Sequence, residues 1–548
     1  MEFSYAYKGN TGITETGTNT QMSFAPDTKR PPTYFIGELR QHIPFREAIS
    51  ALHDVVISDL RFQPKDRTEY QAWREEQDKL DVQLYAAQRE NLAARIAPLQ
   101  AELNQLNHNR NQRLKPFYDA QYKFFHYLYK RDYDAWFVFD PVITVHPDEV
   151  FFECFSQDES SYGRLGVSYE VFHNIQEFAC GTTNIDYSAD LYNEFQKIRT
   201  YKTTQFQIDP SGFEVQTTHE EAYKEVKIDL PDSWVRGFLQ VSSAMSLAAV
   251  QFDLQPMDIH NLCFLLRRHK ERQGPRSIRY ELIPGQPIKI VLEPWNYEIT
   301  CSRSIYPGTT TQTIRVWGRR RLHILERLIP IAKKFTVHLL GTGMPSFYIA
   351  DLGDLSFTLG LSGWTANDWS QSGNFDLMAP RGDVDAETQK IVLAALRETW
   401  AETPNSLAQR LNLSRTAVLG ALGAYAQAGR AIYDLNKQVY RLRELSRDPL
   451  PMERLRFQNE REEKATRFLD RNAVVLTETT SDRAGNLILQ GTVRDYYATH
   501  NPSLVVDRDE RITHAECTCR WHQRHQLYQG PCEHILALRM QQARNFSH

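Results

Sequence analysis

Three of the seven cysteines in this 548-residue chain are crowded together beside a histidine. The pattern is C-x-C, twelve residues, then C-x-H, formed by Cys517, Cys519, Cys532 and His534. On an extended chain both sulfurs of a C-x-C pair point to one side while Thr518 points away. Three thiolates and an imidazole are a donor set that tetrahedral zinc prefers. The sequence therefore predicts that Zn²⁺ ties a strand before Cys517 to a helix beginning at His534.

The spacing of these four residues resembles that of the SWIM zinc finger, a family in which strands lead into the first two ligands and a helix follows the last two. In this sequence the corresponding strands would be 473–478, 486–491 and 503–507. Four protein ligands leave no open coordination position, so the metal is expected to be structural and not a Lewis acid. Three further histidines could compete as ligands but do not match the spacing: His514, His522 and His525.

Length and composition are those of a globular protein with several domains. The chain has 41% hydrophobic and 24% charged residues, and its length exceeds what one hydrophobic core supports. No run of about eighteen apolar residues could cross a bilayer, and the first residues lack the pattern of a secretion signal. We therefore expect no membrane partner and a cytoplasmic location. The remaining cysteines are expected to be buried free thiols: Cys154, Cys180, Cys263 and Cys301.

A polar segment at 66–113 carries apolar residues spaced four, three, four and three apart, which is a heptad seam. Pro98 lies inside the seam and removes one backbone donor, so the helix is expected to bend there. Two interpretations remain open, an antiparallel helical hairpin within the fold and a coiled-coil arm for a partner. The seam consists of Leu92, Ile96, Leu99, Leu103 and Leu106.

The middle of the chain alternates between strand and helix patterns, which predicts a mixed α+β body. Two apolar runs around a His-Pro-Asp turn at 142–152 predict a hairpin. The glycines at 341–343 and 360–363 lack the context of a nucleotide-binding loop, and no G-x-x-x-x-G-K-[ST] motif occurs. Further strands are expected at 205–208, 288–292, 313–317 and 335–340, and helices at 232–249 and 256–271.

Residues 385–445 resemble a winged helix-turn-helix domain, with three helices followed by a hairpin. Its DNA-reading role is less certain than its fold, because the helix starting at Arg415 is rich in alanine and glycine and offers few groups for base or phosphate contacts. DNA contact and docking of a protein therefore both remain open. The nucleic-acid candidates in this domain are Arg415, Thr416, Arg430, Lys437, Arg441 and Arg443.

Two basic segments in the body are further candidates for phosphate contacts, although charged segments are often only solvated. The net charge of −4 is uninformative, because basic and acidic residues nearly cancel. DNA is favoured over RNA as the nucleic-acid partner. The candidates in the two segments are Arg267, Arg268, Lys270, Arg319, Arg320 and Arg321.

The chain as a whole is expected to be an α+β multidomain protein. Stretches such as 155–162, 317–322 and 360–369 are similar to bacterial SWIM-finger proteins that accompany MoxR-type AAA+ ATPases and von Willebrand A domain proteins. That resemblance implies a partner or adaptor in an ATPase assembly, acting in stress response or defence. The expected order is an N-terminal segment packing on the body (1–65), a helical hairpin or coiled-coil arm (66–130), the mixed body (131–380), a winged helix-turn-helix (385–445), a charged linker (446–470) and a SWIM-type zinc finger (471–548).

The sequence favours a zinc-binding adaptor without catalytic residues, which binds nucleic acid, partner proteins or both. One alternative is a scaffold held by the helical arm. The other is a nuclease or another metal-dependent enzyme in the body, although acid pairs such as Asp351 and Asp354 are more often turn residues. The carboxylates available to such an enzyme are Asp148, Glu149, Glu153, Asp158, Asp351 and Asp354.

Overall fold

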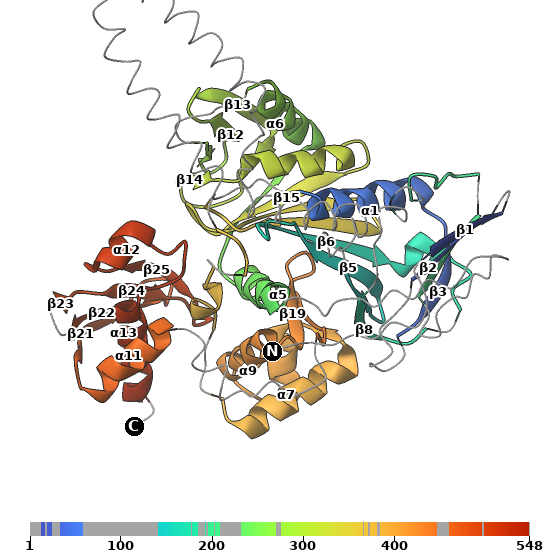
Figure 1. Ribbon diagram of the computed structural model, residues 1–548. Coiled ribbons are helices and arrows are strands. Elements are labelled where there is room, and N and C mark those ends of the chain that lie inside the picture. Colours follow the sequence, from blue (N-terminus) through green and yellow to red (C-terminus); the bar gives the residue numbers. More distant parts are fainter. Residues whose placement is uncertain are drawn as a thin grey trace, which may run out of the picture. The chain divides into compact units, whose positions relative to one another are not determined.

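A computed structural model gives the architecture of the chain (Figure 1). The chain divides into two compact units, 1–59 with 139–548 and 60–138, and the described residues belong to the first. The helical arm predicted at 66–130 therefore lies outside the described residues. The structure describes residues 12–16, 19–24, 33–58, 141–176, 178–184, 192, 195–201, 203–208, 232–269, 276–364, 367–370, 373–380, 384–445, 460–495 and 498–546.

An eight-stranded sheet forms the centre of the body, in the order β10-β15-β16-β17-β6-β5-β4-β8. Every neighbouring pair is antiparallel. The hairpin predicted at 142–152 is confirmed, with Val145 paired to Val150. The strands are β4 Val142–Val145, β5 Glu149–Phe155, β6 Ser161–Ser168, β8 Gly181–Asn184, β10 Val250–Leu254, β15 Lys334–Leu339, β16 Ser346–Asp351 and β17 Leu355–Leu361.

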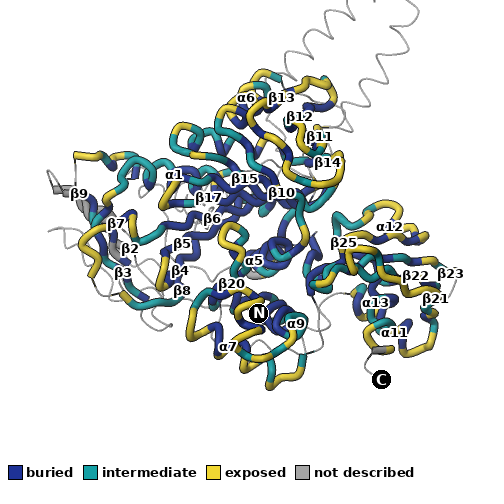
Figure 2. Tube along the Cα trace, turned by 180° about the vertical axis from the view of Figure 1, so that it is seen from behind, coloured by how far each residue is buried: buried dark blue, intermediate teal, exposed yellow. Residues whose placement is uncertain are grey.

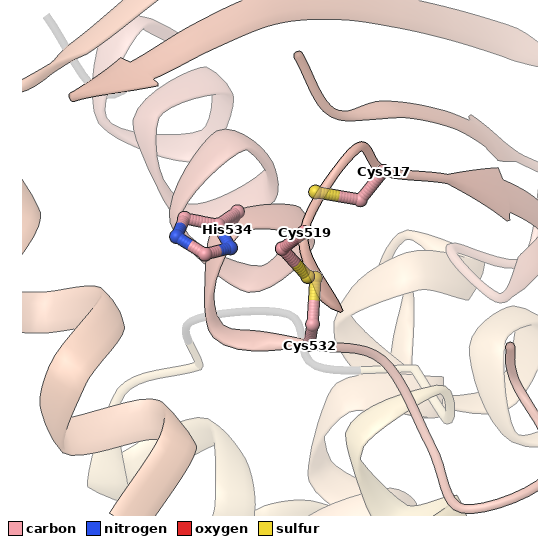
Figure 3. Close-up of side chains that lie close together, drawn as sticks. All are labelled: Cys517, Cys519, Cys532 and His534. Carbon is pink, nitrogen blue, oxygen red and sulfur yellow. The ribbon is translucent and has the colours of Figure 1, made fainter. Parts of the chain in front are cut away.

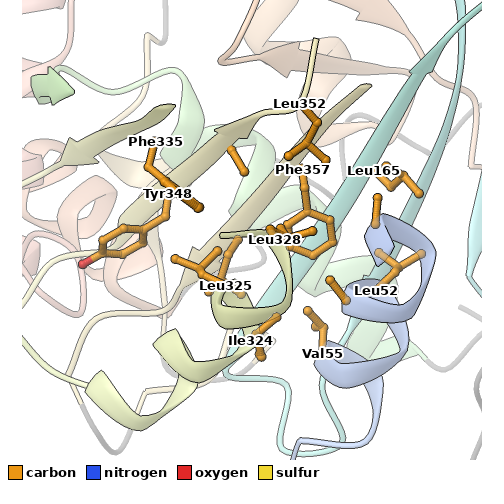
Figure 4. Packing of buried hydrophobic residues seen from close by; sticks show 14 of the residues in the cluster. Leu52, Val55, Leu165, Ile324, Leu325, Leu328, Phe335, Tyr348, Leu352 and Phe357 are labelled. Atoms are coloured by element: carbon orange, nitrogen blue, oxygen red, sulfur yellow. The ribbon is translucent and has the colours of Figure 1, made fainter. Parts of the chain in front are cut away.

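The two faces of this sheet are covered by different helices, because side chains alternate along each strand. On one face, Leu165 of β6 packs in a cluster with Leu52 of α1 and Leu325 of η3 (Figure 4). On the other face, Tyr162 of β6 packs against Phe238 of α5. Strands β5 and β6 are consequently buried along both faces (Figure 2). The helices are α1 His42–Val56, α5 Asp232–Met245 and η3 Arg319–Leu328.

Two smaller sheets complete the body. One has the order β13-β12-β11-β14, and helix α6 contacts both β13 and η3. The other has the order β1-β2-β9-β3-β7, in which β2 and β9 run parallel. The remaining elements of the body are β1 Gly12–Thr16, β2 Asn19–Phe24, β3 Phe35–Leu39, η2 Tyr169–Val171, β7 Phe172–His173, β9 Thr203–Ile208, α6 Pro256–Arg268, β11 Ile278–Leu282, β12 Pro287–Leu292, β13 Tyr297–Ile305, β14 Gln312–Val316 and η4 Phe375–Leu377.

Residues 384–445 form three helices and a three-stranded sheet of order β18-β20-β19, called here the three-helix module. The side chains of Asp385, Thr403 and Ser414 accept backbone N–H groups at the starts of the helices. Asn412 ends the second helix in the left-handed conformation. The elements are α7 Ala386–Thr399, β18 Ala401–Glu402, α8 Pro404–Leu411, α9 Arg415–Gln427, β19 Ala431–Asp434 and β20 Val439–Leu442.

Helix α9 is buried along most of its length (Figure 2). It contacts α7 and α8 of its own module and also α5 of the body. A Cβ added at Gly423 would lie 2.9 Å from the carbonyl oxygen of Pro380, closer than real Cβ atoms are normally found. Gly423 therefore allows the backbone at Pro380 to approach α9 closely, and the small residues of this helix do not form an open surface.

Residues 460–546, called here the C-terminal module, contain a sheet of order β21-β22-β24-β25 with β23 paired to β22. The strands predicted around 473–478, 486–491 and 503–507 are confirmed. The loop expected between Cys519 and Cys532 contains a short helix, α12. The elements are α11 Glu460–Asp470, β21 Val474–Ser481, β22 Leu487–Arg494, β23 Thr499–His500, β24 Ser503–Val506, β25 Ile512–Glu516, α12 Arg520–His525 and α13 Glu533–Phe546.

The structure corrects the second half of the charged linker expected at 446–470. Residues 460–470 form helix α11, which packs against α13. Ala465, Phe468 and Leu469 are buried on one face of α11, because they recur at helical spacing among the charged residues. The C-terminal module therefore begins at 460 or earlier.

Among the described residues, no helix has the length and hydropathy that crossing a bilayer requires.

Candidate metal centre

Three structural elements bring the predicted ligands together. Strand β25 ends just before Cys517, and Cys519 lies at the start of α12, where its sulfur accepts the backbone N–H of His522 at 3.3 Å. Cys532 directly precedes α13, and His534 lies in the first turn of that helix. The intervening Thr518 is exposed while both neighbouring cysteines are buried, as the C-x-C pattern predicts.

The ligand atoms of Cys517, Cys519, Cys532 and His534 all lie within 4.8 Å of one another (Figure 3). All four side chains are buried. Sulfurs bound to one tetrahedral zinc lie roughly 3.8 Å apart, because each Zn–S bond is about 2.3 Å long. Three thiolates and one imidazole in this arrangement fit structural Zn²⁺, which confirms the predicted ligand set.

The buried imidazole of His534 supports this assignment independently. Neither ring nitrogen has a hydrogen-bond partner among the described residues, and the residue is 2% exposed. Buried polar atoms in native proteins are nearly always paired, since an unpaired one carries a desolvation cost. A zinc ion bound to one ring nitrogen would satisfy it.

The three thiols strongly affect each other's protonation. The hydrogen bond with Cys519 raises the pKa of Cys517 to about 12, and bonding to the other two thiols also raises the pKa of Cys532. Hydrogen bonds from Cys517 and Cys532 lower the pKa of Cys519. Because three neighbouring thiolates repel one another, a cation is required for all three to ionise together. Bound zinc supplies that charge and links β25, α12 and α13.

A second group of polar side chains lies beside His534. A carboxylate oxygen of Asp495, a ring nitrogen of His500 and a ring nitrogen of His534 lie within 4.8 Å of one another. The rings of His500 and His534 have centroids 4.3 Å apart. Histidines that bind zinc usually pair their other nitrogen with a carboxylate or a similar group. Asp495 and His500 are therefore close enough to orient the ring of His534 once zinc is bound, although neither forms a hydrogen bond to it in this structure. The sequence did not indicate them because they precede the motif by more than a strand.

We expect Asp495→Ala to raise the dissociation constant for zinc by about tenfold, within the range for loss of such outer partners. Competition with a chromogenic chelator would measure the change. Glu516→Ala is the matched control, since this exposed carboxylate lies next to Cys517 but pairs with His514. Equal losses in the two variants would indicate a general charge effect and would contradict the positioning role.

The structure corrects two of the predicted nucleic-acid contacts, Arg319 and Arg321. Arg319 donates to the carbonyl oxygen of Ser277 at 3.1 Å, and Arg321 forms an ion pair with Asp158 at 3.3 Å. Their exposed fractions are 5% and 4%. A guanidinium that is enclosed to this extent cannot reach a phosphate. Arg320, between them in the chain, is exposed.

Arg441 and Arg443 are corrected in the same way, because both are completely buried. Arg441 binds Asp148 at 2.8 Å and Asp434 at 2.7 Å, while Arg443 lies 3.4 Å from Glu153. These contacts join the β19–β20 hairpin to strand β5 of the body and to the turn before it. We call the participating side chains the hairpin ion network: Asp148, Glu149, Glu153, Arg164, Asp434, Lys437, Arg441 and Arg443.

The acids and bases of this network remain charged at neutral pH. Burial alone would raise the pKa of Asp434, but the charges of Arg164 and Arg441 outweigh burial and hold its pKa at about 2. Burial lowers the pKa of His146 to about 4, so the imidazole is neutral, and its Nε2 donates to the carbonyl oxygen of Leu442 at 2.5 Å. Charged pairs and one neutral histidine thus fix the hairpin on the body.

The other candidates in the three-helix module are partly enclosed. Arg415 forms an ion pair with Asp509 of the C-terminal module at 2.7 Å. Lys437 lies 3.0 Å from both Asp148 and Glu149. Thr416 and Arg430 are half-buried. The side chains of this module that were predicted to contact DNA are thus largely engaged in contacts within the protein.

The basic segment at the end of α6 remains on the surface. Arg267 is 65% exposed and forms an ion pair with Glu326, and Arg268 is also exposed. Lys270 lies outside the described residues.

The acids considered for a nuclease have other partners. Asp148, Glu149, Glu153 and Asp158 pair with lysine or arginine. Asp351 accepts the backbone N–H of Gly353 at 2.9 Å, as a turn residue does. Asp354 accepts a hydrogen bond from the amide of Gln41.

Comparisons with known proteins agree with the metal centre. The SWIM zinc finger family matches residues 502–538, which include all four ligands. No curated protein matches the chain. Among solved structures, the proliferating cellular nuclear antigen of Entamoeba histolytica is similar over 40% of this chain and 88% of its own, at 10% identity and a TM-score of 0.28. Similarity at this level assigns neither a fold nor a function.

Proposed function

We propose that the protein is a non-enzymatic adaptor that binds nucleic acid and partner proteins, with zinc as a structural component. The observation that supports this most directly is the closed Cys3His set inside a SWIM zinc finger, because such a site stabilises a binding module and has no coordination position for a substrate. Three cysteine thiolates as ligands require reduced thiols, so the proposal places the protein in the cytoplasm.

We also propose that the three-helix module is a winged helix whose usual DNA-reading surface serves for docking within the protein. The order of helices and strands from α7 to β20 is that of this fold. The buried α9, the ion pair between Arg415 and Asp509, and the buried Arg441 support docking over reading of double-stranded DNA. Nucleic-acid contact is then a role for exposed cations of the body, such as Arg268 and Arg320.

An AAA+ ATPase of the MoxR type or a von Willebrand A domain protein is the proposed protein partner, in stress response or defence. The support is the sequence similarity of stretches such as 155–162 and 317–322 to proteins found with these ATPases. Recovery of the tagged protein from its own cells, with and without nuclease treatment, would test this. A partner ATPase that remains after nuclease treatment is the expected result, and its absence under both conditions would contradict the proposal.

Nucleic-acid binding is tested by fluorescence anisotropy with labelled oligonucleotides at increasing salt. Phosphate contacts release counterions, so the logarithm of the affinity should fall linearly with the logarithm of the salt concentration. Arg268→Gln with Arg320→Gln should flatten this slope, whereas Thr416→Ala with Arg430→Gln should not. No binding at low salt to any oligonucleotide would contradict the nucleic-acid role.

A further inference from the structure

The two basic segments of the body meet in space although they are about fifty residues apart in sequence. Arg279 and Arg315 are direct cross-strand partners on β11 and β14, and both bind Glu293. At the other end of the region, Arg267 of α6 pairs with Glu326 of η3. One surface therefore carries cations from α6, β11, β14 and the start of η3.

Three aromatic rings lie within this surface. His269 follows α6, and its ring centroid lies 4.5 Å from that of Tyr297 and 5.3 Å from that of Trp295. Trp295 and Tyr297 have centroids 6.4 Å apart and planes inclined by only 30°. The guanidinium of Arg319 lies 5.0 Å from the ring centroid of Trp295 and supports it from within the body. We call His269, Trp295 and Tyr297 the aromatic triad.

The triad is accessible. Tyr297 is 43% exposed, while Trp295 and His269 are half-buried. Tyr297 and Glu298, the first two residues of β13, are both exposed. His269 and Trp295 are thus partly packed against the protein, while part of the triad faces solvent.

The charges around the triad favour an anionic partner. Exposed arginines occur on both sides of it in the chain, at Arg267, Arg268, Arg276 and Arg320. The acids in this region are each paired with a cation: Glu293 is only 10% exposed in its side chain and is shared between two arginines, Glu298 pairs with Lys289, and Glu326 pairs with Arg267. Cations beside open aromatic rings match a backbone of phosphates whose bases are free to stack.

We propose that this surface binds single-stranded nucleic acid, with one or two bases stacked on the aromatic triad and phosphates on the arginines. Paired bases in a duplex are already stacked on both faces, so a duplex could use the cations but not the rings. If a protein bound this surface instead, the affinity would depend only weakly on salt concentration, and the test can give that outcome. The inference rests on the proposed nucleic-acid role and specifies its ligand class and location.

The test compares binding of the full-length, zinc-loaded protein to a labelled oligothymidylate and to a hairpin duplex of similar charge. We expect tighter binding of the single strand. Tyr297→Ala should weaken that binding by about tenfold or more, which is the scale of losing one stacked base, and should leave duplex binding unchanged. Tyr297→Phe should bind as the unchanged protein does, since stacking does not need the hydroxyl.

Tyr201→Ala is the matched control, because Tyr201 is the same residue type, is 76% exposed and precedes β9, outside the elements that carry the triad. Circular dichroism of each variant would show that the fold is retained. If single strand and duplex bind equally and Tyr297→Ala has no effect, the inference is overturned while the nucleic-acid role stands. If neither oligonucleotide binds at low salt, both fail.

Discussion

Cys532→Ser is expected to reduce the zinc content from about one atom per chain to near zero and to unfold the C-terminal module. Structural zinc in small modules contributes roughly 10 kcal/mol or more of binding free energy at neutral pH, and this energy stabilises the fold. Cys532 is completely buried, with an exposed fraction of 0%. Metal analysis and hydrogen exchange of residues 512–546 would measure the two effects.

The loss should extend to neighbouring segments. The ligand cysteines belong to the same hydrophobic cluster as Phe375 and Leu377, and the backbone N–H of Ile512 donates to Met378 at 3.1 Å. Cys180→Ser is the control, because Cys180 is a free thiol outside the metal centre. A Cys532→Ser protein that retains full zinc and native exchange protection would show that another side chain completes the site.

Arg441→Met is expected to lower the free energy of unfolding by roughly 3–5 kcal/mol, the usual effect of removing one partner from a buried ion pair. The change leaves Asp434 and Glu149 buried with one cation fewer. Urea denaturation at pH 7 would show the loss as a lower midpoint. Arg320→Met, at an exposed position, should change stability by about 0.5 kcal/mol or less.

The pH dependence gives a second test of the same contact. Asp434 has a pKa of about 2 in the fold, below the ordinary value of 3.8, so its contribution is complete above about pH 4 and is lost as the pH falls toward 2. The difference between the unchanged protein and Arg441→Met should shrink over that range. Asp434→Asn should restore part of the stability when combined with Arg441→Met. Simple addition of the two losses would contradict a direct pairing.

The metal ligands could be predicted from sequence because their chemistry is local. A C-x-C pair and a C-x-H pair each fix their own geometry, and no other donor set in the region matches. The strands and helices of the body were also predictable where apolar residues recur at a clear period, as in 288–292 and 335–340. Helix α11 was missed because its buried face is narrow and lies among charged residues.

Which partner each basic side chain contacts could not be predicted from the sequence. Arg441 and Asp148 are far apart in the chain, and a basic residue on a strand looks the same whether it meets a phosphate or a buried carboxylate. The aromatic triad was missed for a similar reason, since His269 and Tyr297 meet only after α6 and β13 have packed. Local patterns specify elements, whereas the partner of a charge is decided by tertiary contacts.

The hydrophobic cluster around the metal centre also imposes an order on biosynthesis. The cluster includes Phe155 and Tyr162 of the central sheet, Phe238 of α5, and Cys532 and Leu536 of the C-terminal module. Chains emerge from the ribosome starting at the N-terminus, and domains tend to fold in that order. The part of this cluster that surrounds the metal centre is therefore synthesised after the central sheet and α5. We expect zinc to bind late in folding, so that expression under zinc depletion should lower the yield of fully folded protein.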